Sequence, residues 1–241
     1  MSVVDIHCHI LPGLDDGSPD MATSIAMARL AVSAGISTVI GTPHWIEYEH
    51  ETDPAQIRQI TADLQAELNS RAIPLTVLPG NEAFICPDLP DRVKRGDVLT
   101  LADRGTHLLL ELPYEDLPPY VDDVIFRLQL QGLVPVLAHV ERYAYVRNDW
   151  HVLDRWVQRG CLAQVNASSL DRGRGDDLAQ DLMDHGLVAC TATDAHDAKH
   201  RMPCSIWNEW GRVYLGSYCN EGHCSCWGVA DGSCVRRVSE L

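Results

Sequence analysis

The chain has 241 residues, 46% hydrophobic and 22% charged, so it can bury a sizeable core and is not disordered as a whole. Its 19 Lys and Arg against 34 Asp and Glu give a formal net charge of −15, which argues against a general nucleic-acid binder. No apolar run approaches the roughly 20 residues of a membrane span, and the N-terminal segment lacks a signal-peptide pattern. We therefore expect a cytoplasmic protein with reduced cysteines.

Short apolar runs alternate with helical patterns along the chain, which is typical of a parallel sheet with crossover helices. Ser18 followed by Pro19, and Asp53 followed by Pro54, predict the starts of the first two helices. In chain order we expect strand 3–6, helix 20–34, strand 37–40, helix 53–71, strand 75–78, strand 107–112, helix 119–131, strand 134–138, helix 149–159, strand 162–165, helix 175–185 and strand 187–191. Seven strands without an internal linker predict an α/β barrel in a domain over residues 1–201.

Residues 202–241 break this pattern and form an atypical C-terminal tail. They hold three of the six Trp and five of the nine Cys, without helical periodicity. One hypothesis is a change of reading frame near residue 202. Others are a small zinc site at Cys219, Cys224 and Cys226 beside His223, or an apolar patch that promotes association.

Histidine and acidic side chains recur where the predicted strands end. In a parallel α/β barrel these ends open on one face, where active sites are built. His7 and His9 are two residues apart, so both rings point the same way in an extended chain. A single such residue is most often only solvated or hydrogen-bonded, but nine convergent ones predict a site. The candidates are His7, His9, Asp15 or Asp16, His44, Glu82, Glu111, His139, Asp194 and His196, whereas Asn166 is polar but no obvious ligand.

The charges of this cluster predict bound cations. Four carboxylates in one cavity would repel one another, and two or three divalent ions, with about +4 to +6 charges, would remove the conflict. Imidazole and carboxylate ligands suit manganese, iron, zinc or cobalt. Such ions activate water for hydrolysis. Cys8 lies between the two histidines and is expected to face the packing as a small hydrophobe.

Two arginines follow these strand ends closely. Arg142 comes three residues after His139, and Arg201 comes seven residues after Asp194. Guanidinium groups bind phosphate oxygens in pairs, so both are candidates for catalytic phosphate binding. The alternative for either one is an ordinary surface ion pair.

The motifs that carry these residues resemble a known family. Residues 5–17, with the sequence DIHCHILPGLDDG, resemble the start of the capsule-type (CpsB/CapC) tyrosine-protein phosphatases of the polymerase and histidinol phosphatase (PHP) superfamily. Later segments match further motifs: TPH at 42–44, GNE at 80–82, ELP at 111–113, HVERY at 139–143 and TDAH at 193–196 followed by Arg201. The match covers residues 5–201 and stops where the tail begins.

The resemblance implies a distorted (βα)7 barrel with a trinuclear metal site, usually active with manganese. It implies Asp16 rather than Asp15 as a ligand, Glu82 and Asp194 as bridging ligands, and Arg142 and Arg201 as phosphate-binding residues. The implied ligands are His7, His9, Asp16, His44, Glu82, Glu111, His139, Asp194 and His196. The implied substrate is phosphotyrosine on a protein, typically a bacterial tyrosine kinase of capsule or exopolysaccharide synthesis. A homo-oligomer is left open.

Other functions remain as alternatives. Cys86 and Arg92 have the Cys-x5-Arg spacing of cysteine-dependent phosphatases, but two Pro and two Asp lie in the loop between them, where a phosphate cradle needs N–H donors. An amidohydrolase would need a bridging lysine, and neither Lys94 nor Lys199 follows a strand end. A small-molecule PHP phosphoesterase, such as histidinol-phosphate phosphatase, would share the ligands. An inactive metal-binding remnant is the non-enzymatic alternative.

Overall fold

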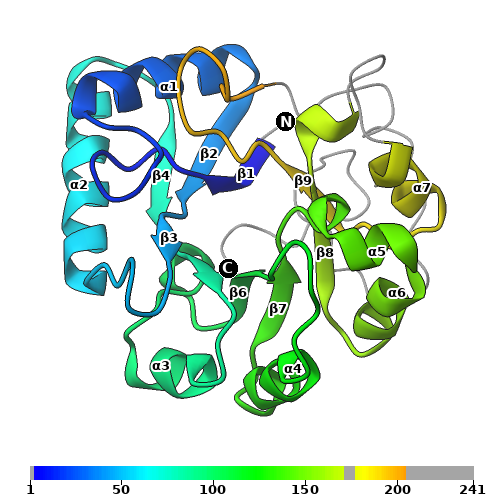
Figure 1. Ribbon diagram of the computed structural model, residues 1–241. Coiled ribbons are helices and arrows are strands. Elements are labelled where there is room, and N and C mark those ends of the chain that lie inside the picture. Colours follow the sequence, from blue (N-terminus) through cyan, green and yellow to red (C-terminus); the bar gives the residue numbers. More distant parts are fainter. Residues whose placement is uncertain (1–2, 171–176, 205–241) are drawn as a thin grey trace.

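A computed structural model describes residues 3–170 and 177–204, and the predictions for the tail beyond residue 204 lie outside this part of the chain. Parallel strands curl around one axis, with helices such as α2 and α4 on the outside (Figure 1). The described strands are β1 (Val3–Cys8), β2 (Ile36–Gly41), β3 (His44–Trp45), β4 (Thr76–Pro79), β5 (Glu82–Phe84), β6 (His107–Glu111), β7 (Val134–Leu137), β8 (Leu162–Asn166) and β9 (Cys190–Ala192). The described helices are α1 (Met21–Ser33), α2 (Pro54–Ser70), α3 (Leu89–Arg95), α4 (Val121–Leu130), α5 (Ala144–Asn148), α6 (His151–Gln158) and α7 (Asp177–Asp184).

The strands form an interrupted barrel. One sheet has the order β1-β2-β4, and the other has the order β3-β5-β6-β7-β8-β9. The chain runs from β2 through residues 42–43 into β3, and from β4 through residues 80–81 into β5, so each pair is one strand with a break. Counted in this way, seven strands follow one another in chain order. A parallel bridge from Cys8 to Ala195 then joins the first strand to the segment after the last. The predicted barrel of seven strands is confirmed.

The break after β2 begins at a proline, and a contact between the two broken strands determines how they pair. Pro43 has no N–H to donate, so the ladder of β2 cannot continue through it. The carbonyl of Pro43 instead accepts hydrogen bonds from the Asn81 side chain at 3.0 Å and from the Glu82 backbone at 3.1 Å. His44 consequently pairs in register with Glu82. The distortion of the barrel therefore brings two candidate ligands side by side.

The first helix was predicted over residues 20–34, close to the observed α1, but its predicted N-cap, Ser18, is wrong by two residues. Asp20 caps α1, because its extended backbone lets its carboxylate accept the Thr23 N–H at 2.8 Å. Ser18 is buried, and its hydroxyl bonds the Asp20 carbonyl and the Ser24 hydroxyl, so it ties the loop to the helix. The start of α2 at Asp53 and Pro54 is as predicted. The short helices α3 and α5 were not predicted, and β9 is shorter than the predicted strand.

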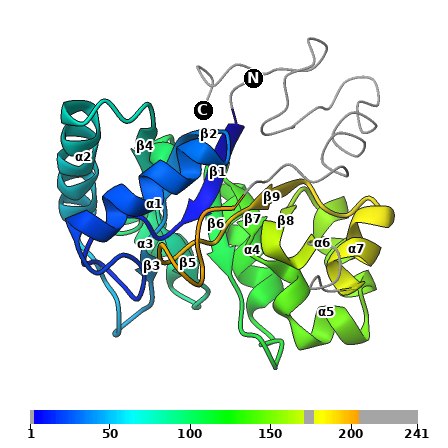
Figure 2. The same ribbon diagram turned by 90° about the horizontal axis from the view of Figure 1, so that it is seen from above.

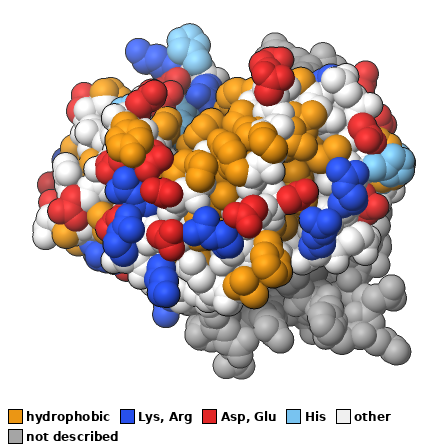
Figure 3. Space-filling view, turned by 60° about the horizontal axis from the view of Figure 1, so that its bottom comes forward, with side chains coloured by type: hydrophobic (Ala, Val, Ile, Leu, Met, Phe, Trp, Pro, Cys, Tyr) orange, Lys and Arg blue, Asp and Glu red, His pale blue; other side chains and the backbone are white. Residues whose placement is uncertain are grey.

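Helices cover the outer side of the barrel. Figure 2 shows α1 and α2 on one side of β1, β2 and β4. Cys8 is fully buried in a core cluster with Ile10 and Met27, as predicted for a small hydrophobe. On the face in Figure 3, acidic and basic side chains surround an area of hydrophobic side chains. Among the described residues, no helix is long and apolar enough to cross a membrane.

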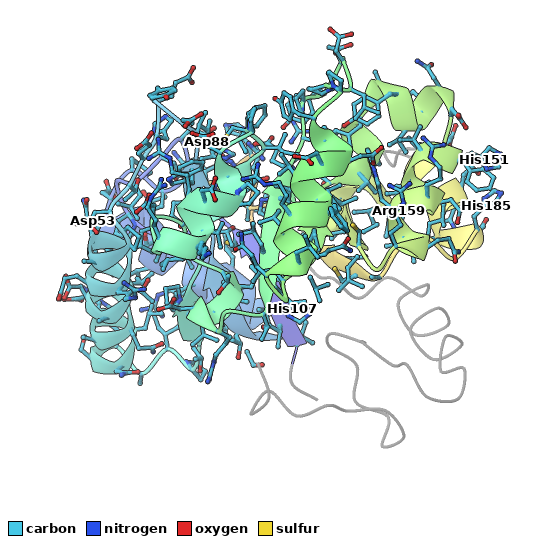
Figure 4. The ribbon with its side chains drawn as sticks, turned by 90° about the horizontal axis from the view of Figure 1, so that it is seen from below. Asp53, Asp88, His107, His151, Arg159 and His185 are labelled. Atoms are coloured by element: carbon cyan, nitrogen blue, oxygen red, sulfur yellow. The ribbon has the colours of Figure 1, made fainter. Side chains whose placement is uncertain are left out.

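The two ends of the barrel differ. In Figure 4, Asp53 and Asp88, which precede α2 and α3, lie towards one end, and His107, the first residue of β6, lies at the other. Because helices begin where strands have ended, the first of these ends is the carboxyl end of the strands. The division of the chain at residues 201 and 202 stays a prediction.

Candidate metal centre

The structure brings together all nine residues that the sequence predicts as metal ligands. They come from β1, β3, β5 and β6, and from the segments that follow β1, β7 and β9. Potential ligand atoms within 4.8 Å of one another form four overlapping groups. These groups are His7 with Glu82 and His139; His7 with His9 and Asp194; His44 with Glu82 and Glu111; and His9 with Asp16, His44 and His196. The groups share members, so they are adjacent positions in one cluster.

Glu82 is at the centre of the cluster. Its Oε2 lies 3.2 Å from His7 Nε2, 3.3 Å from His9 Nε2 and 3.0 Å from His44 Nδ1. Its Oε1 lies 3.0 Å from His139 Nε2. Oε2 is buried and makes no contact with proper hydrogen-bond geometry. Both oxygens of this one carboxylate therefore face histidine nitrogens.

Asp194 also faces His7 and His9. Its Oδ1 lies 3.4 Å from His7 Nε2 and 3.5 Å from His9 Nε2. The two histidine Nε2 atoms are only 3.2 Å apart. Burial opposes ionisation of Asp194, but the nearby His7 and His9 hold the pKa of this carboxyl well below its usual range. The geometry directs two imidazole nitrogens and a carboxylate at the same space.

The outermost group is more open to solvent. Asp16 Oδ1 lies 3.5 Å from His44 Nε2 and 3.5 Å from His196 Nε2, and its side chain is 65% exposed. Burial, together with the neighbouring His9, lowers the pKa of His196 to about 4. His196 is therefore unprotonated at neutral pH and can offer a lone pair.

Two of the predicted ligands have strained backbones. His139 has φ 31° and Asp194 has φ 51°, both in the left-handed region that residues with a Cβ rarely adopt. Each follows the end of a barrel strand, where the chain turns sharply. Such strain persists only where surrounding contacts hold it, and it concentrates at functional sites.

The two predicted phosphate-binding arginines lie beside this cluster. Arg201 donates to Asp194 Oδ2 at 2.8 Å, and Arg142 Nη1 lies 3.6 Å from the same oxygen. Both side chains are about two-fifths exposed, at 44% and 42%. The Arg142 guanidinium lies over the Tyr114 ring, 4.6 Å from its centroid. Both cations thus border the cluster and remain accessible to a ligand from solvent.

Asp15 and Tyr114 support the site in roles that were not predicted from the sequence, although Asp15 was considered there as an alternative ligand to Asp16. Asp15 is buried and accepts the His9 Nδ1–H at 2.6 Å. Burial by itself would raise the pKa of this carboxyl, but the bond to His9 outweighs burial and lowers the pKa to about 2. It also accepts the backbone N–H of His44 at 3.0 Å. Tyr114 donates to Glu111 Oε1 at 2.5 Å and supports Arg142. The two adjacent acidic residues were a sequence signal for the role of Asp15, because Asp15 orients a histidine while Asp16 faces the solvent-exposed side of the cluster.

Gly17 makes the approach of this loop to His9 possible. A Cβ at this position would lie 2.4 Å from both the Cβ and the carbonyl oxygen of His9. Gly17→Ala is therefore expected to destabilise the metal-free protein by about 1–3 kcal/mol and to weaken Mn²⁺ binding, measured by denaturant unfolding and by titration. In Gly132→Ala the new Cβ meets nothing within 4 Å, so Mn²⁺ affinity should not change. Equal Mn²⁺ affinities in both variants would contradict this reading of Gly17.

The alternative cysteine mechanism has no site around Cys86. Burial, followed by the nearby Glu47, raises the pKa of the Cys86 thiol to about 11. The Arg92 guanidinium is occupied by Glu47 at 3.1 Å and Glu51 at 3.4 Å rather than facing the thiol as a phosphate ligand. Lys94 and Lys199 are exposed, so neither provides the buried bridging lysine of an amidohydrolase.

The donor set fits divalent metal ions. His44 Nδ1 and Glu82 Oε2 are buried, lie 3.0 Å apart in the cluster and lack hydrogen-bond partners. Buried polar atoms are normally satisfied, so unpaired ones at a convergent cluster are suited to bind a cation. Mixed nitrogen and oxygen donors without thiolate suit manganese, iron, zinc or cobalt.

The protonation of the cluster predicts how metal affinity depends on pH. Burial opposes the charged form of His7, but Glu82 and Asp194 outweigh it and raise its pKa to about 9. A metal ion must displace this proton, so affinity should rise with pH between 6 and 8, about tenfold per unit for each proton released. Calorimetric Mn²⁺ titration in two buffers of different ionisation enthalpy counts those protons. An affinity independent of pH would contradict the expected proton release.

Comparison with known proteins identifies relatives over most of the chain. The family model described as "Capsular polysaccharide synthesis, CpsB/CapC" matches residues 3–206. The tyrosine-protein phosphatase YwqE of Bacillus subtilis (strain 168) is 38% identical over 202 residues, which are 83% of this chain and 79% of the relative. The tyrosine-protein phosphatase CpsB of Streptococcus agalactiae serotype V is 24% identical over 212 residues, covering 83% of this chain and 86% of the relative.

Comparison with solved structures identifies relatives of the same kind. A solved structure from a study of YwqE of B. subtilis and CpsB of Streptococcus pneumoniae, described as "unique metal-dependent tyrosine phosphatases", matches with a TM-score of 0.81 and 36% identity. The match covers 90% of this chain and 88% of that chain. A histidinol phosphatase fold from Listeria monocytogenes matches with a TM-score of 0.50 at 10% identity, over 81% of this chain and 96% of that chain, which supports only a shared barrel type.

Proposed function

Because the chain belongs to the CpsB/CapC family of capsular polysaccharide synthesis, we propose that it is a metal-dependent protein-tyrosine phosphatase. The observation that carries the proposal is the surroundings of Glu82. Its buried Oε2 lies within 3.3 Å of three histidine nitrogens without a hydrogen bond to any of them, and two arginines lie nearby beside Asp194. A buried cluster of metal ligands next to accessible guanidinium groups is what phosphoester hydrolysis requires.

The nine clustered residues are the proposed ligands of two to three divalent ions. Glu82 and Asp194 are placed to be shared between ions, because each faces at least two histidines. When bound, such ions supply activation of water and neutralisation of the charge that develops on phosphate. We favour manganese, with iron, zinc and cobalt as alternatives. The ligands are His7, His9, Asp16, His44, Glu82, Glu111, His139, Asp194 and His196.

The remaining side chains bind and orient the substrate. Arg142 and Arg201 present guanidinium groups on the accessible side of Asp194, where they would bind equatorial phosphate oxygens. The Tyr114 ring packs against the Arg142 guanidinium, and the Tyr114 hydroxyl donates a hydrogen bond to Glu111. The leaving group of a phosphotyrosine is a phenol, which is more acidic than an alcohol, so the reaction depends less on a general acid.

The family also suggests where the activity acts. The proposed substrate is a phosphotyrosine protein of capsule or exopolysaccharide synthesis, first of all a bacterial tyrosine kinase. We propose a cytoplasmic location for this activity, where the cysteines are expected to stay reduced. The names of the relatives favour protein phosphotyrosine over a small-molecule phosphate ester.

Phosphate release from a phosphotyrosine peptide tests the proposal directly. Chelator-stripped protein should be inactive, and Mn²⁺ should restore turnover. The Cys86→Ser variant should match the unsubstituted protein, because this thiol is buried away from the cluster. Metal-independent turnover that Cys86→Ser removes would overturn the mechanism. Metal-dependent release from histidinol phosphate, with none from the peptide, would move the assignment to a small-molecule phosphoesterase.

A further inference from the structure

Strand β8 contributes two buried polar side chains that are not among the proposed ligands. Gln164 is fully buried and Asn166 is 7% exposed. They are two residues apart on one strand, so both side chains point to the same side of the sheet. Burial of two amides costs free energy unless their groups are hydrogen-bonded. Their partners therefore show what these residues do.

The two amides connect two proposed ligands that come from opposite ends of the chain. The Asn166 Nδ2 donates to Asp194 Oδ2 at 2.8 Å. The Gln164 Nε2 donates to Asn166 Oδ1 at 2.9 Å, and Gln164 Oε1 lies 3.1 Å from His7 Nδ1. A continuous chain of hydrogen bonds thus runs from His7 through both amides to Asp194. We call it the amide relay.

The direction of the amide relay follows from its two ends. An ionised Asp194 can only accept, so Asn166 must turn its NH₂ group towards it and its oxygen towards Gln164. Gln164 must then donate to Asn166 and present its own oxygen to His7. The backbone N–H of His139, which can only donate, also reaches Gln164 Oε1 at 2.9 Å. Two independent constraints therefore give the same orientation of Gln164.

This direction determines the hydrogen position on His7. An acceptor opposite Nδ1 keeps a ring hydrogen there, so Nε2 is the nitrogen that is free to give up its proton and offer a lone pair to a metal ion. That nitrogen is the one that faces Glu82, Asp194 and His9. The same amide oxygen supports the backbone of His139 at its strained φ of 31°.

The relay is itself anchored to the segment that carries Arg142. The Asn166 backbone N–H donates to Glu141 Oε1 at 2.9 Å, and the Ser169 hydroxyl donates to the same oxygen at 2.7 Å. Glu141 is buried and directly precedes Arg142. The end of β8 is therefore held in place relative to the turn after β7.

We propose that Gln164 and Asn166 are positioning residues of the metal centre: the amide relay presents His7 Nε2, the Asp194 carboxylate and the His139 backbone in the geometry that binds metal. The inference rests on the proposed metal-dependent function. Partners of this kind, one step removed from the metal, change its affinity about 10- to 100-fold when they are lost.

Two isosteric substitutions test the relay. Asn166→Asp replaces the donor to Asp194 with a second carboxylate. Gln164→Glu keeps an acceptor for His7 but forces Asn166 to turn its amide over, so that an oxygen faces Asp194. Both variants should weaken Mn²⁺ binding about 10- to 100-fold, measured from the electron paramagnetic resonance of the unbound ion. Two matched controls on exposed helices, Asn69→Asp on α2 and Gln158→Glu on α6, should stay within about twofold.

The readouts separate positioning from a merely structural role. If Gln164 and Asn166 have only a structural role, their substitution should lower the Tm of the chelator-treated protein and leave the Mn²⁺ affinity of the folded protein unchanged. That result in either variant overturns the inference. If one variant does not fold, the other decides. Failure of the unsubstituted protein to bind any of Mn²⁺, Zn²⁺ or Co²⁺ would instead overturn the proposed function on which the inference rests.

Discussion

Replacing Asp194 with alanine is expected to lower kcat/KM for a phosphotyrosine peptide by about 10³-fold or more. Its Oδ1 faces the Nε2 atoms of His7 and His9, and its Oδ2 accepts bonds from Arg201 and Asn166. The substitution removes a proposed shared ligand and the anchor of one arginine together. A metal ion contributes several kcal/mol to transition-state stabilisation, and each 1.36 kcal/mol is a factor of ten in rate.

The matched control for this variant is Asp63→Ala. Asp63 is exposed on α2, where it accepts a hydrogen bond from Gln59, and its loss should leave kcat/KM unchanged. Both proteins are compared at equal Mn²⁺ concentration after circular dichroism has shown that they are folded. An Asp194→Ala protein that is folded and retains more than about one tenth of the activity would contradict the proposed ligand set.

Replacing Arg201 with alanine is expected to lower kcat/KM about 10²- to 10³-fold, because a charged donor to the transferring phosphate is lost. Mn²⁺ affinity should change little, since Arg201 is a neighbour of Asp194 rather than a proposed ligand. Arg201→Lys should recover only part of the activity, because an ammonium group lacks the paired donors of a guanidinium. Steady-state kinetics and metal titration on the same samples separate the two effects.

Arg155→Ala on α6 is the control for charge alone. Arg155 is exposed, and within the described part of the chain its guanidinium bonds only the backbone carbonyl of His151. Its removal should therefore not affect turnover. If Arg201→Ala and Arg155→Ala give the same kcat/KM, Arg201 does not bind the phosphate. If Arg201→Ala instead loses Mn²⁺ in parallel with activity, its main contact is with Asp194 and the metal centre.

The order of the barrel strands and the positions of the candidate ligands could be predicted from the sequence. Hydrophobic periodicity and turn-forming residues are local properties of a sequence. The bounds of β6, α2 and β7 were therefore predicted to within about two residues. Because parallel strands of a barrel expose their carboxyl ends on one face, the sequence also predicted that His44, Glu111 and His139 share that face. That inference needs only the direction of each strand, which the chain order supplies.

Interactions between distant parts of the chain decided the rest. The breaks after β2 and β4 depend on the bond from Asn81 to the Pro43 carbonyl, and no periodicity signals a contact of that kind. Asp20 rather than Ser18 caps α1, because the Ser18 hydroxyl is already engaged with the Asp20 carbonyl and the Ser24 hydroxyl. Local propensity cannot anticipate a side chain that tertiary contacts have already engaged.

The sequence alone determined which residues could bind metal, because His, Asp and Glu at successive strand ends are chemically sufficient for it. Only the tertiary structure decided what holds them in place. Gln164 meets His7 across 157 positions of the chain, and Asn166 meets Asp194 across 28. Those hydrogen bonds form only when the barrel brings β8 between β7 and β9, near β1. Ligand identity is a property of residue types, whereas ligand orientation is a property of the assembled barrel.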